Sequence, residues 1–171
     1  MHIIGHMWRY LEKHFSGNGA KLRVVTTMLK LGISVGKGGV LLCGPIELAP
    51  AKFARAVGVD RRVVISAAKE IASDPEMADV FSRLVPTANV AGAARMLGHD
   101  VIEIDADPNT VGLVGKVSSL LARHKVGIRQ IIADDPDLYP EPKMRLVVEG
   151  RLPRKAAEEL RALRLQAISF K

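Results

Sequence analysis

The sequence predicts an α+β protein with two domains: a mainly helical domain over residues 7–98 and a second domain over residues 99–171. Two observations lead to this prediction. Apolar residues recur at helical spacing through most of the first part, whereas short alternating segments and helical segments follow one another after Gly98. A length of 171 residues is enough for one ordinary domain or two small ones.

The helical domain is expected to begin with two helices and a hairpin. In HMWRYLEKHF, Met7, Leu11 and Phe15 are spaced four apart, and SGNG ends this first helix. AKLRVVTTMLKL predicts a second helix with Gly32 as its C-cap. ISVGKGGVLLC predicts a small hairpin with Lys37 at its tip. The first six residues do not continue the helical pattern and do not enter the fold prediction.

The stretch AKFARAVGVDRRVVISAAKEIA predicts two short helices that turn at Gly58, as in a helix-turn-helix of the winged-helix type. Ala54 is small where the helices would cross, Gly58 can adopt the left-handed conformation of the turn, and Asp60 can cap the second helix. Side chains suited to phosphates and base edges would then face outward, and with the hairpin tip they form the predicted DNA-binding set: Lys37, Arg61, Arg62, Ser66 and Lys69. An ordinary αα-hairpin remains an alternative.

Two further helices are expected before the second domain. DPEMADVFSRLV opens with Asp74 as N-cap and Pro75 at the first helical position. PTANVAGAARMLG predicts a shorter helix that ends at Gly98.

The second domain is expected to have the order βαββαβ, the ferredoxin-like arrangement. Its strands are predicted in VIEIDA, IRQIIADD, KMRLVVEG and LQAISFK, and its helices in TVGLVGKVSSLLARHK and PRKAAEELRALR, the latter with Pro153 at its start. The acidic, proline-rich loop DPDLYPEP joins the second and third of these strands, and the clustered carboxylates of Asp134, Asp135, Asp137 and Glu141 are expected to be solvated turn residues.

Basic charge is concentrated in the helical part. Residues 1–98 carry 13 Lys and Arg against 7 Asp and Glu, a net charge of +6, whereas residues 99–171 carry 12 against 11, a net charge of +1. A basic domain favours a polyanionic partner such as DNA, and a merely soluble basic surface is the alternative.

The stretch DADPNTVGLVGKV predicts a site for a small zwitterion. Gly112 opens a helix, and a helix N-terminus presents N–H groups that suit a carboxylate. Asp107 could hold an amino group, and Asn109 could both donate and accept. An α-amino acid carries both groups. The alternative is a plain capped helix in which Asp107 and Asn109 serve the turn.

The segment DPNTVGLVGKVSSLLARHKVGIRQI, together with the order βαββαβ, resembles an ACT domain, the small-molecule-sensing module of amino-acid metabolism. This resemblance covers about residues 100–171. With GVDRRVV, LVPTAN and IIADDPDL, the whole chain looks like an archaeal family of predicted regulators of amino-acid metabolism that joins a helix-turn-helix to an ACT domain.

The resemblance implies a homodimer that binds an amino acid between two ACT domains. The site would be formed by a loop of one subunit and a strand of the other: Asp107, Asn109, Thr110, Val111, Gly112 and Leu113, facing Ile128, Arg129 and Gln130. Gly127 stands where some amino-acid-binding ACT domains have asparagine. An ACT domain that only dimerises is the alternative.

Other classes of function find little support in the sequence. No apolar run approaches the ~20 residues that span a bilayer. Cys43 is the single cysteine, which excludes an internal disulfide and fits a cytoplasmic address. Neither a metal site, a cofactor site nor a nucleophile with its base is predicted, so no enzymatic activity is expected. The expected function is therefore an amino-acid-responsive, DNA-binding regulator, and the alternative is a regulatory subunit that docks on a metabolic enzyme without contacting DNA.

Overall fold

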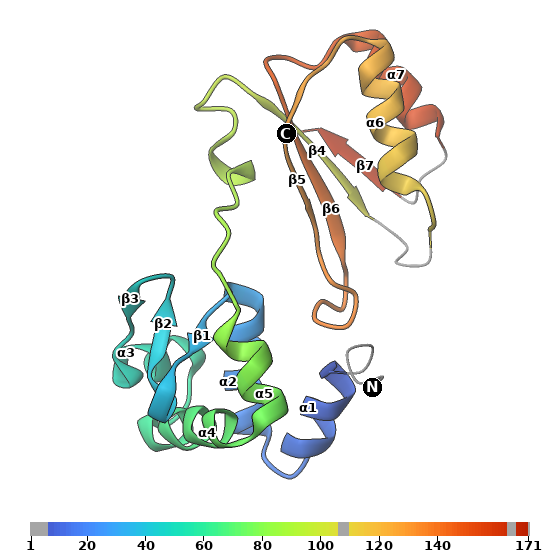
Figure 1. Cartoon of the computed structure of the whole chain (residues 1–171). Helices are drawn as coiled ribbons and strands as arrows, with labels where there is room; N and C mark the ends of the chain where they lie inside the picture. The colour runs from blue at the N-terminus through green and yellow to red at the C-terminus, as the bar shows by residue number, and fades with distance from the viewer. Residues whose placement is uncertain (1–6, 106–109, 164–166, 171) are drawn as a thin grey trace. The chain divides into compact units, whose positions relative to one another are not determined.

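The computed structural model describes residues 7–105, 110–163 and 167–170. The chain is an α+β protein with a helical region over residues 7–82, followed by an antiparallel four-stranded sheet with two helices (Figure 1). It divides into two compact units between Thr87 and Ala88, earlier than the boundary predicted after Gly98. No helix in the described part of the chain is long and apolar enough to cross a membrane.

The helical unit contains the predicted helices and the predicted hairpin. Its elements are α1 (Met7–Phe15), α2 (Gly19–Leu31), β1 (Ser34–Val35), β2 (Leu41–Cys43), β3 (Ile46–Glu47), α3 (Pro50–Val57), α4 (Arg61–Ser73) and α5 (Pro75–Ser82). A 3₁₀ turn, Lys37–Gly39, joins β1 to β2. The strand β3, which was not predicted, pairs with β2 and completes a small antiparallel sheet of order β1-β2-β3.

The predicted helix caps are confirmed. Gly32 ends α2 and Gly58 ends α3, both with left-handed backbone at φ 63° and 72°. The Asp60 carboxylate accepts a hydrogen bond from the backbone N–H of Arg62 at 2.7 Å at the start of α4. Asp74 accepts from two backbone N–H groups in the first turn of α5. These contacts satisfy N–H groups that a helix start would otherwise leave without acceptors.

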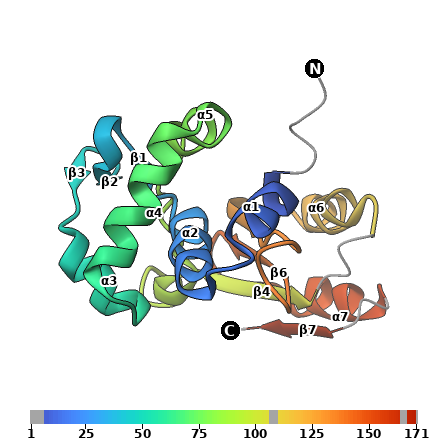
Figure 2. The ribbon, with the colours of Figure 1, turned by 90° about the horizontal axis from the view of Figure 1, so that it is seen from below.

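The core of the helical unit is centred on α4, which packs against α2, α3 and α5 (Figure 2). Its inward face is apolar and fully buried: Val64, Ala67, Ala68 and Ile71. The 3₁₀ turn rests directly on this helix, because a Cβ at Gly39 would come within 2.9 Å of the Lys69 backbone nitrogen. A glycine is therefore required where the hairpin meets α4.

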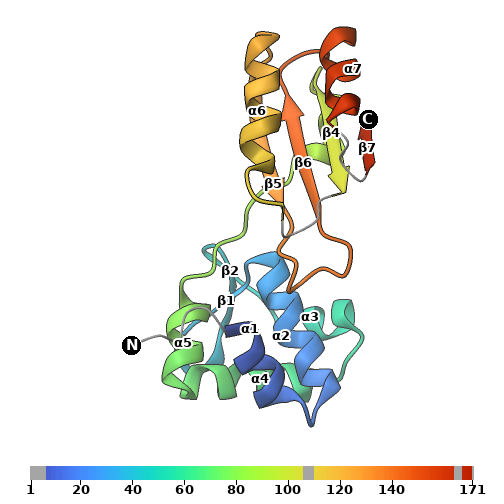
Figure 3. The same ribbon diagram turned by 90° about the vertical axis from the view of Figure 1, so that its right-hand side faces the viewer.

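The second unit has the predicted order βαββαβ. Its elements are β4 (Asp100–Asp105), α6 (Leu113–Arg123), β5 (Ile128–Ala133), β6 (Lys143–Val148), α7 (Arg154–Ala162) and β7 (Ala167–Phe170). The strand order is β5-β6-β4-β7, and all neighbours are antiparallel. The helices α6 and α7 cover one face of the sheet, α6 on the side of β5 and α7 on the side of β7 (Figure 3).

Successive side chains of β4 and β6 point to opposite faces of the sheet, so each face is lined by every second residue of these strands. The residues toward α6 and α7 are apolar and buried: Ile102, Ile104, Met144, Leu146 and Val148. Their neighbours in the sequence face the opposite side, where Val101 and Val147 form a smaller core with Val90, Ala91 and Ala94. Both faces of the sheet are thus partly covered.

The prediction of a helix that ends at Gly98 is wrong. The segment forms only a 3₁₀ turn, Ala91–Ala93, followed by turns. Gly92 lowers the helical propensity of the segment. Val90, Ala91 and Ala94 reach Val101 and Val147 from this short turn, so burial against the sheet replaces a regular helix.

Polar contacts fasten α1 and α2 to α4 and the start of α5. The Tyr10 hydroxyl donates to Asp74 Oδ2 at 2.7 Å, and the Glu70 carboxylate pairs with His14 and Lys21. The backbone N–H of Met77 contributes most to lowering the pKa of Asp74, against the opposing effect of burial, and Tyr10 adds to it. Asp74 therefore stabilises the folded unit in its ionised form.

We predict that Asp74→Ala destabilises the helical unit by about 1–2 kcal/mol at pH 7, the usual range for a lost N-cap. The folded-state pKa of Asp74 lies below its unfolded value of ~3.9, so this stabilisation is present above that pH and is lost as the pH falls through the folded value. Urea unfolding followed by the fluorescence of Trp8 in α1 measures both effects. The matched control is Asp79→Ala, which removes an exposed pair with Arg83 on α5. Equal losses in the two variants, or a loss that does not diminish as the pH falls below ~4, would contradict the prediction.

Candidate functional site

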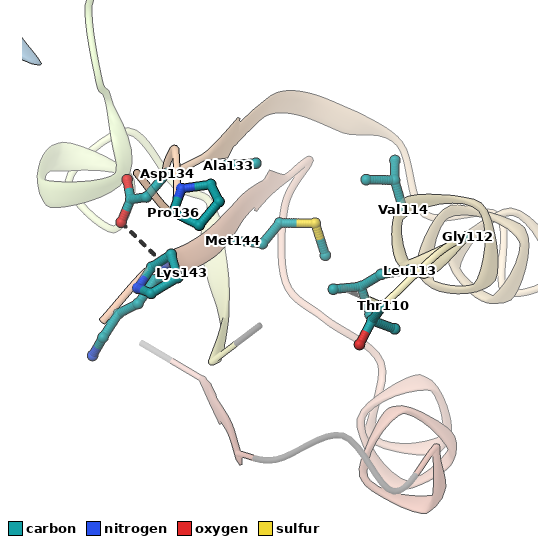
Figure 4. Close-up of a pocket in the computed structure, with 10 residues that line it drawn as sticks. Thr110, Gly112, Leu113, Val114, Ala133, Asp134, Pro136, Lys143 and Met144 are labelled. Carbon is teal, nitrogen blue, oxygen red and sulfur yellow. Dashed lines mark hydrogen bonds between the residues drawn. The ribbon is translucent and has the colours of Figure 1, made fainter. Parts of the chain in front are cut away.

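A cavity of about 270 Å³ lies in the second unit between the start of α6 and the adjoining ends of β5 and β6. One wall is formed by Thr110, Gly112, Leu113 and Val114, and the other by Ala133, Asp134, Pro136, Pro142, Lys143 and Met144. In Figure 4 the Met144 side chain extends toward Leu113 across the cavity. Most of these side chains are apolar, so the cavity suits a small ligand with an apolar part.

The start of α6 supplies the polar end of the cavity. Gly112 stands at the N-cap with a left-handed backbone at φ 79°, and among the described residues no side chain caps this helix. Within the described residues, no side chain accepts a hydrogen bond from the backbone N–H groups at the start of α6. By contrast, Asp60 and Asp74 accept such bonds at the starts of α4 and α5. Backbone N–H groups at such a terminus favour an anion, such as a carboxylate.

A network of charges fixes the opposite wall. Both Asp134 carboxylate oxygens lie 3.1 Å from Arg145 Nη1, and Oδ2 accepts from the backbone N–H of Lys143. Arg145 also donates to Glu103 on β4 at 3.2 Å. The side chain of Asp134 is only 10% exposed. The interpretation of the acidic loop as solvated carboxylates is thus wrong for Asp134, because the residue directly follows β5 and lies against Arg145.

These contacts keep the two basic groups of the wall protonated. Burial of Arg145 is the largest single effect and acts to lower its pKa, but the hydrogen bonds and charges of Asp134 and Glu103 together outweigh it and the pKa is raised. The negative charges of Glu103 and Asp105 raise the pKa of Lys143. The charged side chains are therefore paired with one another, and the surface left for a ligand is mainly apolar.

The predicted loop residues are only partly in the cavity wall. Thr110, Gly112 and Leu113 line it. Val111 is 91% exposed and is not part of the lining. Asp107 and Asn109 lie outside the described residues.

The predicted strand residues lie at the other end of β5 from the cavity of their own chain. Ile128 packs against the core, and Arg129 forms an exposed pair with Glu149 at 3.5 Å. A bulge between Ile128 and Gln130 turns Gln130 to the face opposite Ile128, beside Val147. Within a single chain, these residues therefore do not complete the cavity.

Gln130 has a structural role that sequence reasoning did not find. Its Oε1 accepts from the backbone N–H of Val90 at 3.0 Å, and its Nε2 donates to the Ala88 carbonyl at 2.6 Å. The side chain thus holds the start of the unit against the sheet.

Sequence reasoning also missed the strand wall of the cavity. The sequence did hold a signal for these residues. The loop DPDLYPEP joins two antiparallel strands, so the residues just before and just after the loop must lie side by side. Ala133 and Met144 are such a pair.

The predicted DNA-binding residues all lie on the surface of the helical unit. Arg62, Ser66 and Lys69 are exposed at spacings of four and three residues, and so form one strip along α4. Arg61 is exposed beside them, and the turn that carries Lys37 packs against α4 at Ala68 and Lys69.

Arg62 and Asp60 form an exposed pair at the start of α4. Arg62 Nε lies 3.1 Å from Asp60 Oδ1, and 88% of the Arg62 side chain is exposed. Hydrogen bonds from Arg62, first of all its backbone N–H, lower the pKa of Asp60. The arrangement leaves the Arg62 guanidinium in contact with solvent, where it could meet an anionic partner.

Residues considered for other chemistry form no site in the described ranges. No group of three or more His, Cys, Asp or Glu side chains there could hold a metal ion. Cys43 is half-buried on β2. A scan against protein-family models finds no match, and neither does a search of curated proteins or of solved structures.

We predict that Gln130→Ala releases the segment before β4. Loss of two hydrogen bonds to the backbone should cost about 1–2 kcal/mol, and hydrogen exchange at the Val90 amide should accelerate at least fivefold. Arg129→Ala, which removes an exposed pair on the same strand, is the matched control. Unchanged exchange at Val90 in Gln130→Ala would show that the side chain does not anchor the segment.

Proposed function

We propose that the protein is a cytoplasmic, amino-acid-responsive regulator whose second unit binds a small amino acid and whose helical unit binds DNA. The observation that carries the proposal is the apolar cavity at the start of α6, which includes Thr110, Gly112 and Leu113 of the predicted site and where no side chain of the described residues caps the helix. The order βαββαβ with strands arranged β5-β6-β4-β7 is that of a ferredoxin-like fold. It supports the interpretation of this unit as an ACT domain.

The cavity favours an amino acid with a small aliphatic side chain. Its carboxylate would lie at the backbone N–H groups that begin α6. Its side chain would lie among Leu113, Val114 and Met144. A volume of about 270 Å³ is small for a ligand cavity, which disfavours large aromatic side chains.

The position of β5 supports a dimeric site. This strand is at the edge of the four-stranded sheet, so a second copy of β5 could pair with it. Antiparallel pairing about a twofold axis would bring Ile128 and Arg129 of the second subunit to the Ala133 end of the first, where the cavity lies. Val114 and Ile131, which are 45% and 39% exposed, would lose solvent contact near that edge.

The arrangement of α3 and α4 supports DNA binding by the helical unit. The helices are joined by a short turn at Gly58, and α4 exposes the basic strip defined by Arg62, Ser66 and Lys69. In a helix-turn-helix the second helix enters the major groove, where such residues contact phosphates and base edges.

The two activities would be coupled through the dimer. A ligand bound between two second units favours one arrangement of the subunits, and that arrangement sets the spacing of two copies of α4. Half-sites one turn of DNA apart require a spacing of ~34 Å. A ligand with no preference between arrangements would have no effect on DNA affinity.

We predict that one or more small aliphatic amino acids raise the midpoint of thermal unfolding. At ~100 times the dissociation constant, binding to the folded state alone contributes ~2.7 kcal/mol. Val114→Trp should fill the cavity and abolish the shift, whereas Ser119→Trp, at an exposed position further along α6, should retain it. If none of the twenty amino acids shifts the midpoint, or if Val114→Trp responds like the wild type, the proposed ligand site is wrong.

We predict that the full chain binds duplex DNA with an affinity that falls steeply with salt. Replacing both Arg61 and Arg62 by Ala should weaken binding and reduce the slope of log K against log salt by ~1.8, if each contacts one phosphate. Fluorescence anisotropy of a labelled duplex at several salt concentrations measures both. The matched control replaces Arg154 and Lys155, an exposed basic pair at the start of α7, by Ala. Equal losses in the two double variants would indicate non-specific attraction and count against α4 as the DNA-binding helix.

A further inference from the structure

The segment that leaves the helical unit is held against the end of α2. The backbone of Val85 and Pro86 passes so close to Gly32 that a Cβ there would lie 2.2 Å from the Val85 carbonyl oxygen. Leu84 packs against the core of the helical unit, and the Pro86 ring lies beside Gly44 in the turn between β2 and β3. Gly32 thus ends α2 and also makes room for this segment. Up to Pro86, the backbone belongs to the helical unit.

The segment that enters the second unit is held by β5. The Gln130 side chain accepts from the backbone N–H of Val90 and donates to the Ala88 carbonyl. The Val90 side chain packs into the small core on the outer face of the sheet. Asn89 Oδ1 accepts from the backbone N–H of Ala91 at 3.0 Å, which tightens the same turn. From the Ala88 carbonyl onward, the backbone therefore belongs to the second unit.

A single residue, Thr87, lies between these two attachments. It is exposed, and among the described residues none forms a hydrogen bond with it. The ring of Pro86 fixes the φ angle of that residue. Rotation between the attachments is thus confined to ψ of Pro86 and the backbone angles of Thr87 and Ala88. This connection differs from a flexible linker of many residues, in which the distance between two domains varies widely.

We propose that Thr87 is the hinge between the two units, and that Gln130 fixes the second unit's side of it. Hinges are commonly a few loop residues that absorb changes in φ and ψ while the elements on both sides keep their structure. Gln130 is on β5, the edge strand at which a second subunit is proposed to pair, so a change at that edge reaches the linker through the Gln130 side chain. This use of the hinge in regulation rests on the proposed function, whereas the hinge itself does not.

Residual dipolar couplings of the weakly aligned full chain test the hinge without any ligand. One alignment tensor is fitted to each unit from the couplings of its helices and strands. We expect two different tensors, with the couplings of Val85 fitting that of the helical unit and those of Val90 fitting that of the second unit. In Gln130→Ala, the deviation of Val90 from its tensor should grow about threefold, because the attachment is lost. Arg129→Ala, which removes an exposed pair on the same strand, is the matched control and should leave Val90 unchanged.

Three results of this measurement would overturn the hinge. A single tensor that fits both units would show that they do not turn relative to one another. Failure of Val85 or Val90 to fit the tensor of its own unit would show that the mobile segment is longer than proposed. Unchanged couplings of Val90 in Gln130→Ala would show that this side chain does not hold the linker.

The use of the hinge in regulation is tested by lengthening it. Insertion of Gly-Ser-Gly-Ser after Thr87 should retain the separate affinities for DNA and amino acid, and should reduce the effect of each on the other by about fivefold or more. The matched control is the same insertion after Gly17, in the exposed turn between α1 and α2. Unchanged coupling in the lengthened chain overturns this use. If the wild type binds neither ligand, the proposed function fails and this use with it, whereas the dipolar couplings still decide the hinge.

Discussion

Burial of apolar side chains in separate cores is the interaction on which both units depend. In the helical unit, Val64, Ala67 and Ile71 turn one side of α4 inward, and this fixes which side of the same helix meets solvent. In the second unit, the alternation along β4 and β6 sends Ile102 and Leu146 toward the helices. The two surfaces proposed to bind DNA and an amino acid are formed by parts of these elements that do not belong to the centre of either core. The basic strip is the outer side of a core helix, and the cavity lies between the start of α6 and the adjoining ends of β5 and β6.

Features that depend on a few neighbouring residues could be predicted from the sequence. The caps at Asp60 and Asp74 and the left-handed glycines at Gly32 and Gly58 were predicted correctly, because a cap contacts backbone groups within one turn of itself. The order of strands and helices in the second unit was also predictable from periodicity. The segment that ends at Gly98 was not, because its conformation is decided by contact with a sheet formed later in the chain.

In the candidate site, too, features that depend on neighbouring residues could be predicted, whereas those that depend on distant residues could not. Thr110, Gly112 and Leu113 lie at or just before the start of α6, and they line the cavity. The contacts of Gln130 within the chain were not predicted and the exposure of Asp134 was misjudged, because both environments depend on distant residues. A bulge reverses the face on which Gln130 lies and brings it to backbone groups some 40 positions earlier. Asp134 resembles its exposed acidic neighbours in sequence, and only the register of β5 with β6 places it against Arg145.

The central claim is that a small ligand in the second unit controls DNA binding by the helical unit. The most direct measurement is the dissociation constant of the full chain for one duplex, with and without a saturating amino acid that stabilises the protein, together with the reciprocal measurement of amino-acid affinity with and without DNA. The account predicts that each ligand changes the affinity of the other by the same factor, of about 5–150-fold. If both ligands bind and neither affinity changes, the two sites are not coupled and the claim is contradicted.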